Sequence, residues 1–365
     1  MRVCIDIQSA IAQRAGVGRY TKLLVEHLAA ARVPADELAL FYFDFKRHGI
    51  PFPAPGASQR ACRWLPGRFI QKAWKTIGWP PFDRFAGNAD VFHFPNFIRP
   101  PLTRGKSVVT IHDLAFLRMP ETIEQKNYHY LKSCIRETVE KSDAIIAVSE
   151  FTRKEIIELL GVAPEKVFAI HSGIEPPKTK PETGNLKPES EAPFLFTVGT
   201  LEPRKNYSFL IDVFDRLENF EGELVIAGGR GWKFEPVLER IAKSPRRERI
   251  RILDFVSDDD LDRLYRTCSL FIFPSLYEGF GFPPLEAMAR GTPVVSAATG
   301  SLPEVLGDSA MLIENFDAGN WAEKISPLLA DEAARKKIAA RGPQHSRKFT
   351  WQETARKTWE IYKSL

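Results

Sequence analysis

Short apolar segments alternate with amphipathic segments along most of the chain. The apolar segments are four to six residues long and end at polar or glycine-rich stretches, as buried strands do. In the first half they occupy residues 2–7, 38–43, 91–94, 108–111, 144–148 and 167–170. Helical spacing of apolar residues appears at residues 20–30 and 124–141. Alternating strands and helices predict a parallel sheet with helices on both faces.

The same alternation begins again after residue 193. The second set of strand candidates lies at residues 194–198, 224–227, 250–253, 270–273 and 293–296. Residues 175–193 are rich in Pro, Glu and Lys and nearly free of large apolar side chains, which is typical of a linker. We therefore predict an α/β protein with two Rossmann-like, doubly wound domains, at residues 1–174 and 194–350. An amphipathic helix at residues 351–365 should pack back on the first domain.

Composition supports this organisation and argues against several other classes. A chain of 365 residues with 44% hydrophobic residues can bury two cores. No stretch approaches the roughly 20 apolar residues of a membrane-spanning helix, and the first ten residues lack the layout of a secretory signal, so we expect a cytoplasmic protein. The four cysteines form no CxxC pair and suggest neither a disulfide framework nor a metal site.

Charge is distributed unevenly. Residues 1–173 carry 24 Lys and Arg against 17 Asp and Glu, whereas residues 174–365 carry 27 against 29, so the halves sit at +7 and −2. No acidic residue occurs between Asp44 and Asp83, where seven basic residues and three tryptophans lie. Interleaved basic and aromatic side chains suit an anionic membrane surface. Residues 46–79 therefore form either a membrane-binding surface or an ordinary solvated loop and helix, and we expect no nucleic-acid partner.

The segment FIFPSLYEGFGFPPLEAMARG, residues 271–291, is the most informative one. It predicts a strand, a glycine-rich loop that holds Glu278, and a helix that begins at the two prolines. This places Glu286 in the first helical turn, beside free backbone N–H groups. Such a loop can donate N–H groups to a phosphate, and the two carboxylates can accept hydrogen bonds from the hydroxyl pairs of a sugar and a ribose. The plain alternative is that Glu286 is simply a first-turn carboxylate that the helix dipole stabilises.

This E-x7-E pattern, within EGFGFPPLE, resembles that of glycosyltransferase family 4, whose members are retaining enzymes with the two-domain GT-B fold. The resemblance extends over nearly the whole chain. It implies that Glu278 contacts hydroxyls of the donor sugar and that Glu286 contacts the ribose. The resemblance also places the loop backbone near the sugar and the diphosphate, at Gly279, Phe280, Gly281 and Phe282.

A second segment, VGTLEPRKN at residues 198–206, resembles the turn of that family which meets the diphosphate. The resemblance assigns this contact to Lys205, whose charge can neutralise a leaving diphosphate. Many relatives carry an arginine directly after the glycine, where this chain has Thr200. Arg204 either takes the place of that arginine or is an ordinary loop charge.

The resemblance implies further donor contacts. The AGVGRY loop should bring the Gly16 amide near the donor phosphate, and His112, which opens HDLAF after a strand, should contact the donor sugar and phosphate as a catalytic-site residue. The backbone around Val256 should receive the base. His93 ends another strand, and we interpret it as a core histidine. The paired glycines at 16 and 18 lack the third glycine of the dinucleotide-binding motif.

These features predict a retaining glycosyltransferase that needs no metal and no other cofactor. Resemblance to bacterial mannosyltransferases of O-antigen and exopolysaccharide assembly suggests GDP-mannose as donor and a glycan or lipid-linked acceptor. A front-face displacement, in which the donor phosphate takes the acceptor's proton, is the favoured mechanism. A transferase for UDP-glucose or a UDP-linked N-acetylhexosamine, a non-catalytic nucleotide-sugar-binding protein and an NAD-dependent oxidoreductase remain as alternatives.

Overall fold

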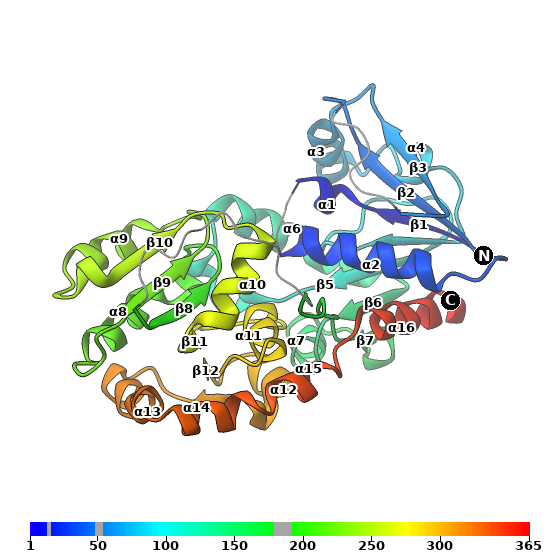
Figure 1. Cartoon of the computed structure of the whole chain (residues 1–365). Helices are drawn as coiled ribbons and strands as arrows, with labels where there is room; N and C mark the ends of the chain where they lie inside the picture. Colours follow the sequence, from blue (N-terminus) through cyan, green and yellow to red (C-terminus); the bar gives the residue numbers. More distant parts are fainter. Residues whose placement is uncertain (13–15, 48–53, 179–191) are drawn as a thin grey trace. The chain divides into compact units, whose positions relative to one another are not determined.

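The computed structural model describes residues 1–12, 16–47, 54–178 and 192–365. These residues form two compact units, each with its own parallel sheet (Figure 1). Unit 1 consists of Met1–Arg118, Gln125–Gly173 and Phe349–Leu365, and unit 2 consists of Met119–Glu124 and Ile174–Lys348. Residues 179–191, which make up most of the predicted linker 175–193, lie outside the described ranges.

Within its described residues, unit 1 contains a sheet of seven parallel strands in the order β3-β2-β1-β4-β5-β6-β7. The order reverses between β1 and β4, and open parallel sheets bind ligands at the carboxyl ends of the strands that flank such a point. The strands are β1 (Arg2–Asp6), β2 (Glu37–Phe43), β3 (Ala57–Cys62), β4 (Val91–Phe94), β5 (Lys106–Ile111), β6 (Ala144–Ala147) and β7 (Val167–Ala169).

Helices cover this sheet because one side of each is apolar. Leu24 and Leu28 of α2 are fully buried, and the N-cap Ser149 accepts the Thr152 N–H to begin α7. The helices of unit 1 are α1 (Gln8–Ala12), α2 (Val17–Ala31), α3 (Gly67–Ile77), α4 (Asp83–Ala86), α5 (Ala115–Arg118), α6 (Gln125–Lys141), α7 (Glu150–Leu160) and α16 (Trp351–Ser364), with a 3₁₀ turn at Pro164–Lys166.

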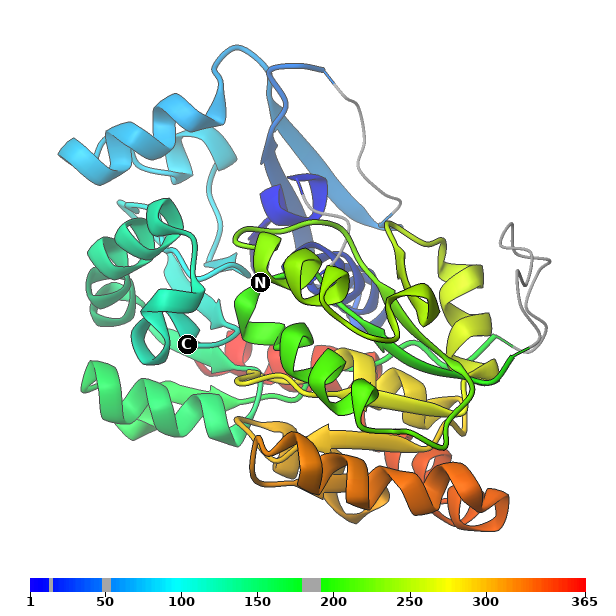
Figure 2. The ribbon, with the colours of Figure 1, turned by 90° about the vertical axis from the view of Figure 1, so that its left-hand side faces the viewer.

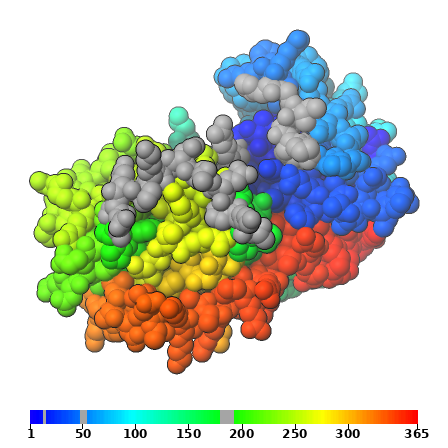
Figure 3. All heavy atoms as spheres, viewed as in Figure 1, coloured from blue at the N-terminus to red at the C-terminus, as the bar shows by residue number. Residues whose placement is uncertain are grey.

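The C-terminal helix α16 lies against α2 in unit 1, where Figure 3 shows the red segment beside the dark-blue one. Trp359 Nε1 donates to the backbone oxygen of Leu28 at 3.1 Å. The Tyr362 hydroxyl lies 2.6 Å from Nδ1 of His93 in the core. The helix that the pattern predicts at residues 351–365 therefore completes the first unit.

Within its described residues, unit 2 contains six parallel strands in the order β10-β9-β8-β11-β12-β13. They are β8 (Phe194–Val198), β9 (Glu223–Ala227), β10 (Ile250–Leu253), β11 (Leu270–Phe273), β12 (Val294–Ala297) and β13 (Met311–Ile313). The order reverses between β8 and β11, which pair with Leu270 opposite Leu195. The carboxyl ends of these two strands therefore define the expected ligand-binding edge of unit 2.

The helices of unit 2 enclose a core that includes the fully buried Trp321. They are α8 (Tyr207–Asp215), α9 (Glu235–Ala242), α10 (Asp258–Thr267), α11 (Phe282–Ala289), α12 (Leu302–Leu306), α13 (Ala318–Ala330), α14 (Glu332–Ala339) and α15 (Gly342–Ser346). Short 3₁₀ turns lie at Pro120–Thr122, Pro203–Lys205, Arg247–Arg249 and Gly307–Ser309.

One segment differs from the predicted division at residue 174. Residues 119–124 belong to unit 2 although the chain on both sides belongs to unit 1. Two hydrogen bonds explain this: Trp232 Nε1 donates to the backbone oxygen of Thr122, and Lys233 Nζ donates to that of Glu121, both at 2.6 Å. Backbone carbonyls carry no pattern in the sequence, so this attachment is invisible before folding.

Candidate functional site

The carboxyl ends of β8 and β11 bring Lys205 and Glu278 together. Lys205 ends the 3₁₀ turn that follows β8, and Glu278 lies in the loop that follows β11. Lys205 Nζ donates to Oε1 of Glu278 at 2.5 Å, and Ser275 Oγ donates to the same oxygen at 2.6 Å. Arg204 Nη1 lies 2.9 Å from the other oxygen, Oε2. The strand reversal thus holds one carboxylate between two cations.

The neighbouring cations determine the ionisation state of Glu278, which is only 8% exposed. Burial favours the neutral form, but the charges of Arg204 and Lys205 and the hydrogen bonds from Lys205 and Ser275 outweigh it and lower the pKa of Glu278 to about 2. Glu278 is therefore an anion throughout the neutral range and can only accept hydrogen bonds.

The backbone of the Glu278 loop is fixed by the turn after β12. The Ser301 N–H and hydroxyl both donate to the Glu278 carbonyl at 3.0 Å. Gly300 (φ 58°) packs so closely that a Cβ there would lie 2.4 Å from the same oxygen. The Thr299 hydroxyl donates to the Ser275 carbonyl at 2.7 Å. The small residues of this turn thereby fix the backbone that carries the Glu278 carboxylate.

The rest of the loop leads into α11, and here one prediction is wrong. The helix begins at Phe282, with Gly281 (φ 97°) as its N-cap, so Glu286 is the fifth helical residue and not part of the first turn. The prediction failed because it began the helix at the prolines. The rings of Phe280 and Phe282 pack edge to face with centroids 5.0 Å apart.

Glu286 is held separately from Glu278. Its side chain is buried, and its Oε2 accepts the Tyr265 hydroxyl at 3.1 Å. The Arg290 guanidinium lies over the Tyr265 ring, 5.2 Å from its centroid, and Arg290 Nε donates to Oδ1 of Asp262 at 2.6 Å. The Tyr265 hydroxyl is thus one of the groups that orient the Glu286 carboxylate.

Val256 and Thr200 also follow the carboxyl ends of strands of unit 2, β10 and β8 respectively. Val256 lies in the turn between β10 and α10, just before Ser257, whose side chain caps α10. Its neighbour Phe255 is 70% exposed. Thr200, which stands where many relatives have an arginine, is exposed directly after Gly199.

Two predicted residues belong to unit 1. Gly16 (φ 59°) precedes α2, where a Cβ would meet no atom of the described chain within 4 Å, so a ligand can approach its backbone. His112 follows β5, and its Nε2 lies 2.7 Å from the Pro95 carbonyl, which can only accept. Burial lowers the pKa of His112, so the ring is neutral near pH 7, with Nδ1 as an acceptor.

His93 is a core residue, as interpreted from the sequence. It is fully buried, Nδ1 lies 2.6 Å from the Tyr362 hydroxyl, and Nε2 lies 2.8 Å from the Thr110 hydroxyl. Burial lowers its pKa to about 3. Its two partners make it a structural element of the unit 1 core.

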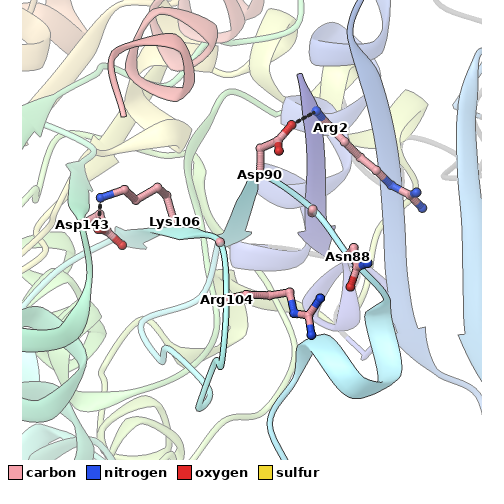
Figure 4. A pocket seen from close by; sticks show the side chains of 8 residues that line it. Arg2, Asn88, Asp90, Arg104, Lys106 and Asp143 are labelled. Carbon is pink, nitrogen blue, oxygen red and sulfur yellow. Dashed lines mark hydrogen bonds and ion pairs between the residues drawn. The ribbon is translucent and has the colours of Figure 1, made fainter.

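A hollow of about 640 Å³ opens at the opposite, amino edge of the unit 1 sheet (Figure 4). Its two carboxylates are already engaged, because Asp90 accepts the backbone N–H of Arg2 at 2.7 Å and Asp143 pairs with Lys106 at 3.1 Å. We assign it no role in donor binding, since ligands of parallel sheets collect at the carboxyl ends.

Several residues of the site had no part in the predictions. Ser275 lies three residues before Glu278 in the same strand-to-loop segment, and that position at a strand's carboxyl end is a signal that could have found it. Glu202, Tyr265, Gly300 and Ser301 come from other segments, and only folding brings them to the two glutamates.

Two family models match the chain in succession. The model described as Glycosyltransferase Family 4 matches residues 14–177, and that described as Glycosyl transferases group 1 matches residues 180–345. Together with two Rossmann-like units and a carboxylate held by cations at a strand reversal, these matches define the class. The chain belongs to the family 4 glycosyltransferases and has the GT-B fold.

Among curated proteins, the chain is similar to bacterial mannosyltransferases. The chain is 28% identical to O-antigen chain mannosyltransferase B of Escherichia coli over 378 residues, 96% of each protein. It is 32% identical to the serotype-specific mannosyltransferase WbdA of Escherichia coli over 267 residues, 68% of this chain but only 32% of that longer protein. The resemblance predicted from the sequence is thereby confirmed.

Solved structures share the fold at low identity. Sucrose-phosphate synthase from Thermosynechococcus elongatus matches with a TM-score of 0.77 at 18% identity, over 100% of this chain and 98% of that one. WaaG, a glycosyltransferase involved in lipopolysaccharide biosynthesis, matches with a TM-score of 0.73 at 16% identity, over 99% of both chains. Anabaena HepE in complex with UDP-glucose gives a TM-score of 0.73 at 18% identity, over 100% of both chains.

Proposed function

We propose that this glycosyltransferase is a retaining mannosyltransferase that uses GDP-mannose and acts in cell-surface polysaccharide synthesis, with a glycan or lipid-linked acceptor. The observation that carries the proposal is the Glu278 carboxylate, anionic and held by Lys205 and Arg204 at the strand reversal of unit 2. The mannosyltransferase relatives support the choice of sugar. A UDP-sugar donor is the second candidate, because HepE was solved with UDP-glucose.

The proposed roles follow from the chemistry of each group. Glu278 has about four acceptor positions, and three donors already occupy it, so about one remains for a hydroxyl of the donor sugar. Glu286 binds the ribose, and Lys205 stabilises the leaving diphosphate together with backbone N–H groups of the glycine-rich loop. The backbone at Val256 receives the base, and neutral His112 accepts a donor hydroxyl at Nδ1.

Two substitutions and a chelator test the proposal. GDP release from GDP-mannose, with mannose-terminated lipid-linked glycans as acceptors, should persist in EDTA because the proposed mechanism uses no metal. Glu278→Ala and Lys205→Met should each lower turnover about 10²-fold or more. Loss of activity in EDTA, or full activity in both variants, would contradict the proposed site.

The same assay separates the alternatives. Turnover of UDP-glucose or UDP-N-acetylglucosamine in place of GDP-mannose would transfer the proposal to a UDP-sugar enzyme. Binding of any of these compounds without turnover would indicate a nucleotide-sugar-binding protein. Tight binding of NAD in calorimetry, with no heat from any nucleotide sugar, would favour the oxidoreductase.

We further propose an anionic membrane surface as a partner, reached through residues 46–79, of which 48–53 lie outside the described chain. Of the ten large apolar side chains that are exposed in the described chain, four fall within residues 46–79. Figure 2 shows α3, the light-blue helix, at an outer edge of unit 1. Its partly exposed surface carries both kinds of side chain, apolar and basic: Phe69, Ile77, Arg68, Lys72 and Lys75. No helix in the described parts of the chain is long and apolar enough to cross a bilayer.

Vesicle flotation tests this partner. Binding should require phosphatidylglycerol in phosphatidylcholine vesicles and weaken with salt, because the attraction is electrostatic. Arg68→Gln with Lys72→Gln should reduce it, whereas Lys336→Gln with Lys337→Gln removes the same charge from unit 2 and should not. Equal recovery on neutral and anionic vesicles would refute the membrane proposal and leave the solvated-surface interpretation.

A further inference from the structure

We propose that Arg204 is a positioning residue for Glu278, fixed in that role by Glu202, and that it is not a ligand of the donor diphosphate. This inference rests on the proposed function, because it concerns how the donor site distributes its charges. The sequence left open whether Arg204 takes the place of a diphosphate-binding arginine at Thr200. We propose instead that Arg204 contacts Glu278 and not the diphosphate.

The guanidinium of Arg204 is already engaged along its whole edge. Nη2 donates to Oε1 of Glu202 at 2.7 Å, and Nη1 lies 2.9 Å from Oε2 of Glu278 and donates to the Tyr277 carbonyl at 2.7 Å. Arg204, Glu202 and Glu278 form a buried triad. The exposed fractions of their side chains are 14% for Arg204, 4% for Glu202 and 10% for Glu278. Turning the guanidinium toward a phosphate would take the cation away from buried Glu202 and would leave Glu278 with Lys205 as its remaining cation, which is costly.

Glu202 is the second carboxylate that holds Arg204. It lies directly before the 3₁₀ turn of residues 203–205, and burial raises its pKa although Arg204 and Lys205 act in the opposite direction. A carboxylate buried in this way needs a charged, hydrogen-bonding partner, and Arg204 is that partner. Here Glu202 anchors the outer nitrogen of Arg204, and the planar fork then presents Nη1 to Glu278 in one orientation.

Arg204 and Lys205 differ in their capacity to bind a diphosphate. Glu202 and Glu278 together match Arg204 and Lys205, so the cluster has no net charge to offer a diphosphate. Lys205 differs from Arg204 because its ammonium has three donors, of which Glu278 takes one, and its other contact is the face of Phe273 at 5.1 Å. Lys205 can therefore keep its bond to Glu278 and still donate to a phosphate oxygen, whereas Arg204 cannot without breaking the triad.

The test distinguishes a loss of affinity for the diphosphate from a loss of correct positioning of the Glu278 carboxylate. GDP and UDP are titrated by calorimetry, and kcat/KM for the donor is measured against pH, for Arg204→Met, Glu202→Gln and Lys205→Met. Arg240→Met is the matched control, because Arg240 also bridges two carboxylates of unit 2, Asp212 and Asp215, at 2.6 and 2.5 Å.

A positioning role predicts that Arg204→Met and Glu202→Gln bind the nucleoside diphosphate within about 2-fold of wild type but lose about 10²-fold in turnover, since misplacing a reacting group by about 1 Å costs that much. Lys205→Met should instead weaken diphosphate binding about 10-fold to 100-fold, the loss of one charge-assisted hydrogen bond. The acid limb of the profile should move upward in Arg204→Met, because Glu278 then keeps one cation. Arg240→Met should change none of these.

Loss of GDP and UDP affinity in Arg204→Met comparable to that in Lys205→Met would overturn the inference, as would full turnover in Glu202→Gln. If Arg204→Met does not fold, Arg204→Lys decides: a phosphate ligand tolerates a point charge, whereas the triad needs the fork. Failure of the proposed function looks different, because the wild-type protein would then bind neither GDP nor UDP.

Discussion

Substitution of Gly300 by alanine tests whether the turn after β12 positions the Glu278 loop. The added Cβ would lie 2.4 Å from the Glu278 oxygen and 2.8 Å from its nitrogen. Carbon and oxygen normally approach to about 3.3 Å, so the loop has to move by about 1 Å. A displacement of that size at a reacting group lowers turnover about 10²-fold.

Stability gives a second magnitude. The left-handed φ of 58° at Gly300 costs an alanine about 1–2 kcal/mol, and forcing extra volume into packed surroundings adds about 1–3 kcal/mol. Gly291, in the same unit, is the matched control, because its φ of 73° carries the same backbone cost while the nearest atom to a Cβ there, Pro343 Cγ, is 4.0 Å away. The expected losses are therefore about 2–5 kcal/mol at Gly300 and about 1–2 kcal/mol at Gly291.

Urea unfolding of the two variants and their turnover of the donor check both magnitudes. Gly300→Ala should be the less stable variant and nearly inactive, and Gly291→Ala should keep most of its activity. Equal stability of the two variants together with wild-type turnover in Gly300→Ala would show that the close packing against Glu278 does not control the loop.

Two further predictions concern the glutamates. The charges of Arg204 and Lys205 outweigh burial and lower the pKa of Glu278 from 4.5 to about 2, so ionised Glu278 contributes roughly 3 kcal/mol above pH 4.5 that is lost as the pH falls from 4.5 to 2. Urea unfolding at pH 6 and pH 3 should show about 2 kcal/mol of this loss in the wild type and less in Glu278→Gln, and equal losses would contradict the ion-pair assignment. Tyr265→Phe removes the hydroxyl that Glu286 accepts, so GDP affinity by calorimetry should fall about 5-fold; an unchanged affinity would mean that the hydroxyl does not orient Glu286.

The fold was predictable wherever buried strands carry a continuous apolar run. β8, β9 and β11 fall at the predicted positions because they are buried inside the sheet, between its helical layers. β3, with the sequence ASQRAC, is an edge strand with mostly exposed side chains and has no such run. β13 is another edge strand, three residues long, and only Ile313 of it is fully buried.

The candidate site was predictable where chemistry lies in one segment. Glu278 and Lys205 follow two strands that a doubly wound sheet places side by side, so their meeting follows from topology. The pairing of Arg204 with Glu202 depends on side-chain directions at a 3₁₀ turn, which the spacing of charges does not determine. Tyr265 reaches Glu286 from another helix, a contact that arises only in the folded unit.

The return of α16 has a consequence for biosynthesis. Unit 1 needs Trp359 and Tyr362 to cover Leu28 and His93, yet the ribosome makes these residues only after all of unit 2. During translation, part of the apolar surface of unit 1 therefore stays exposed while the 175 residues from Ile174 to Lys348 are added. Nascent chains halted before residue 349 should be protease-sensitive in their first half and should depend on chaperones until α16 is released.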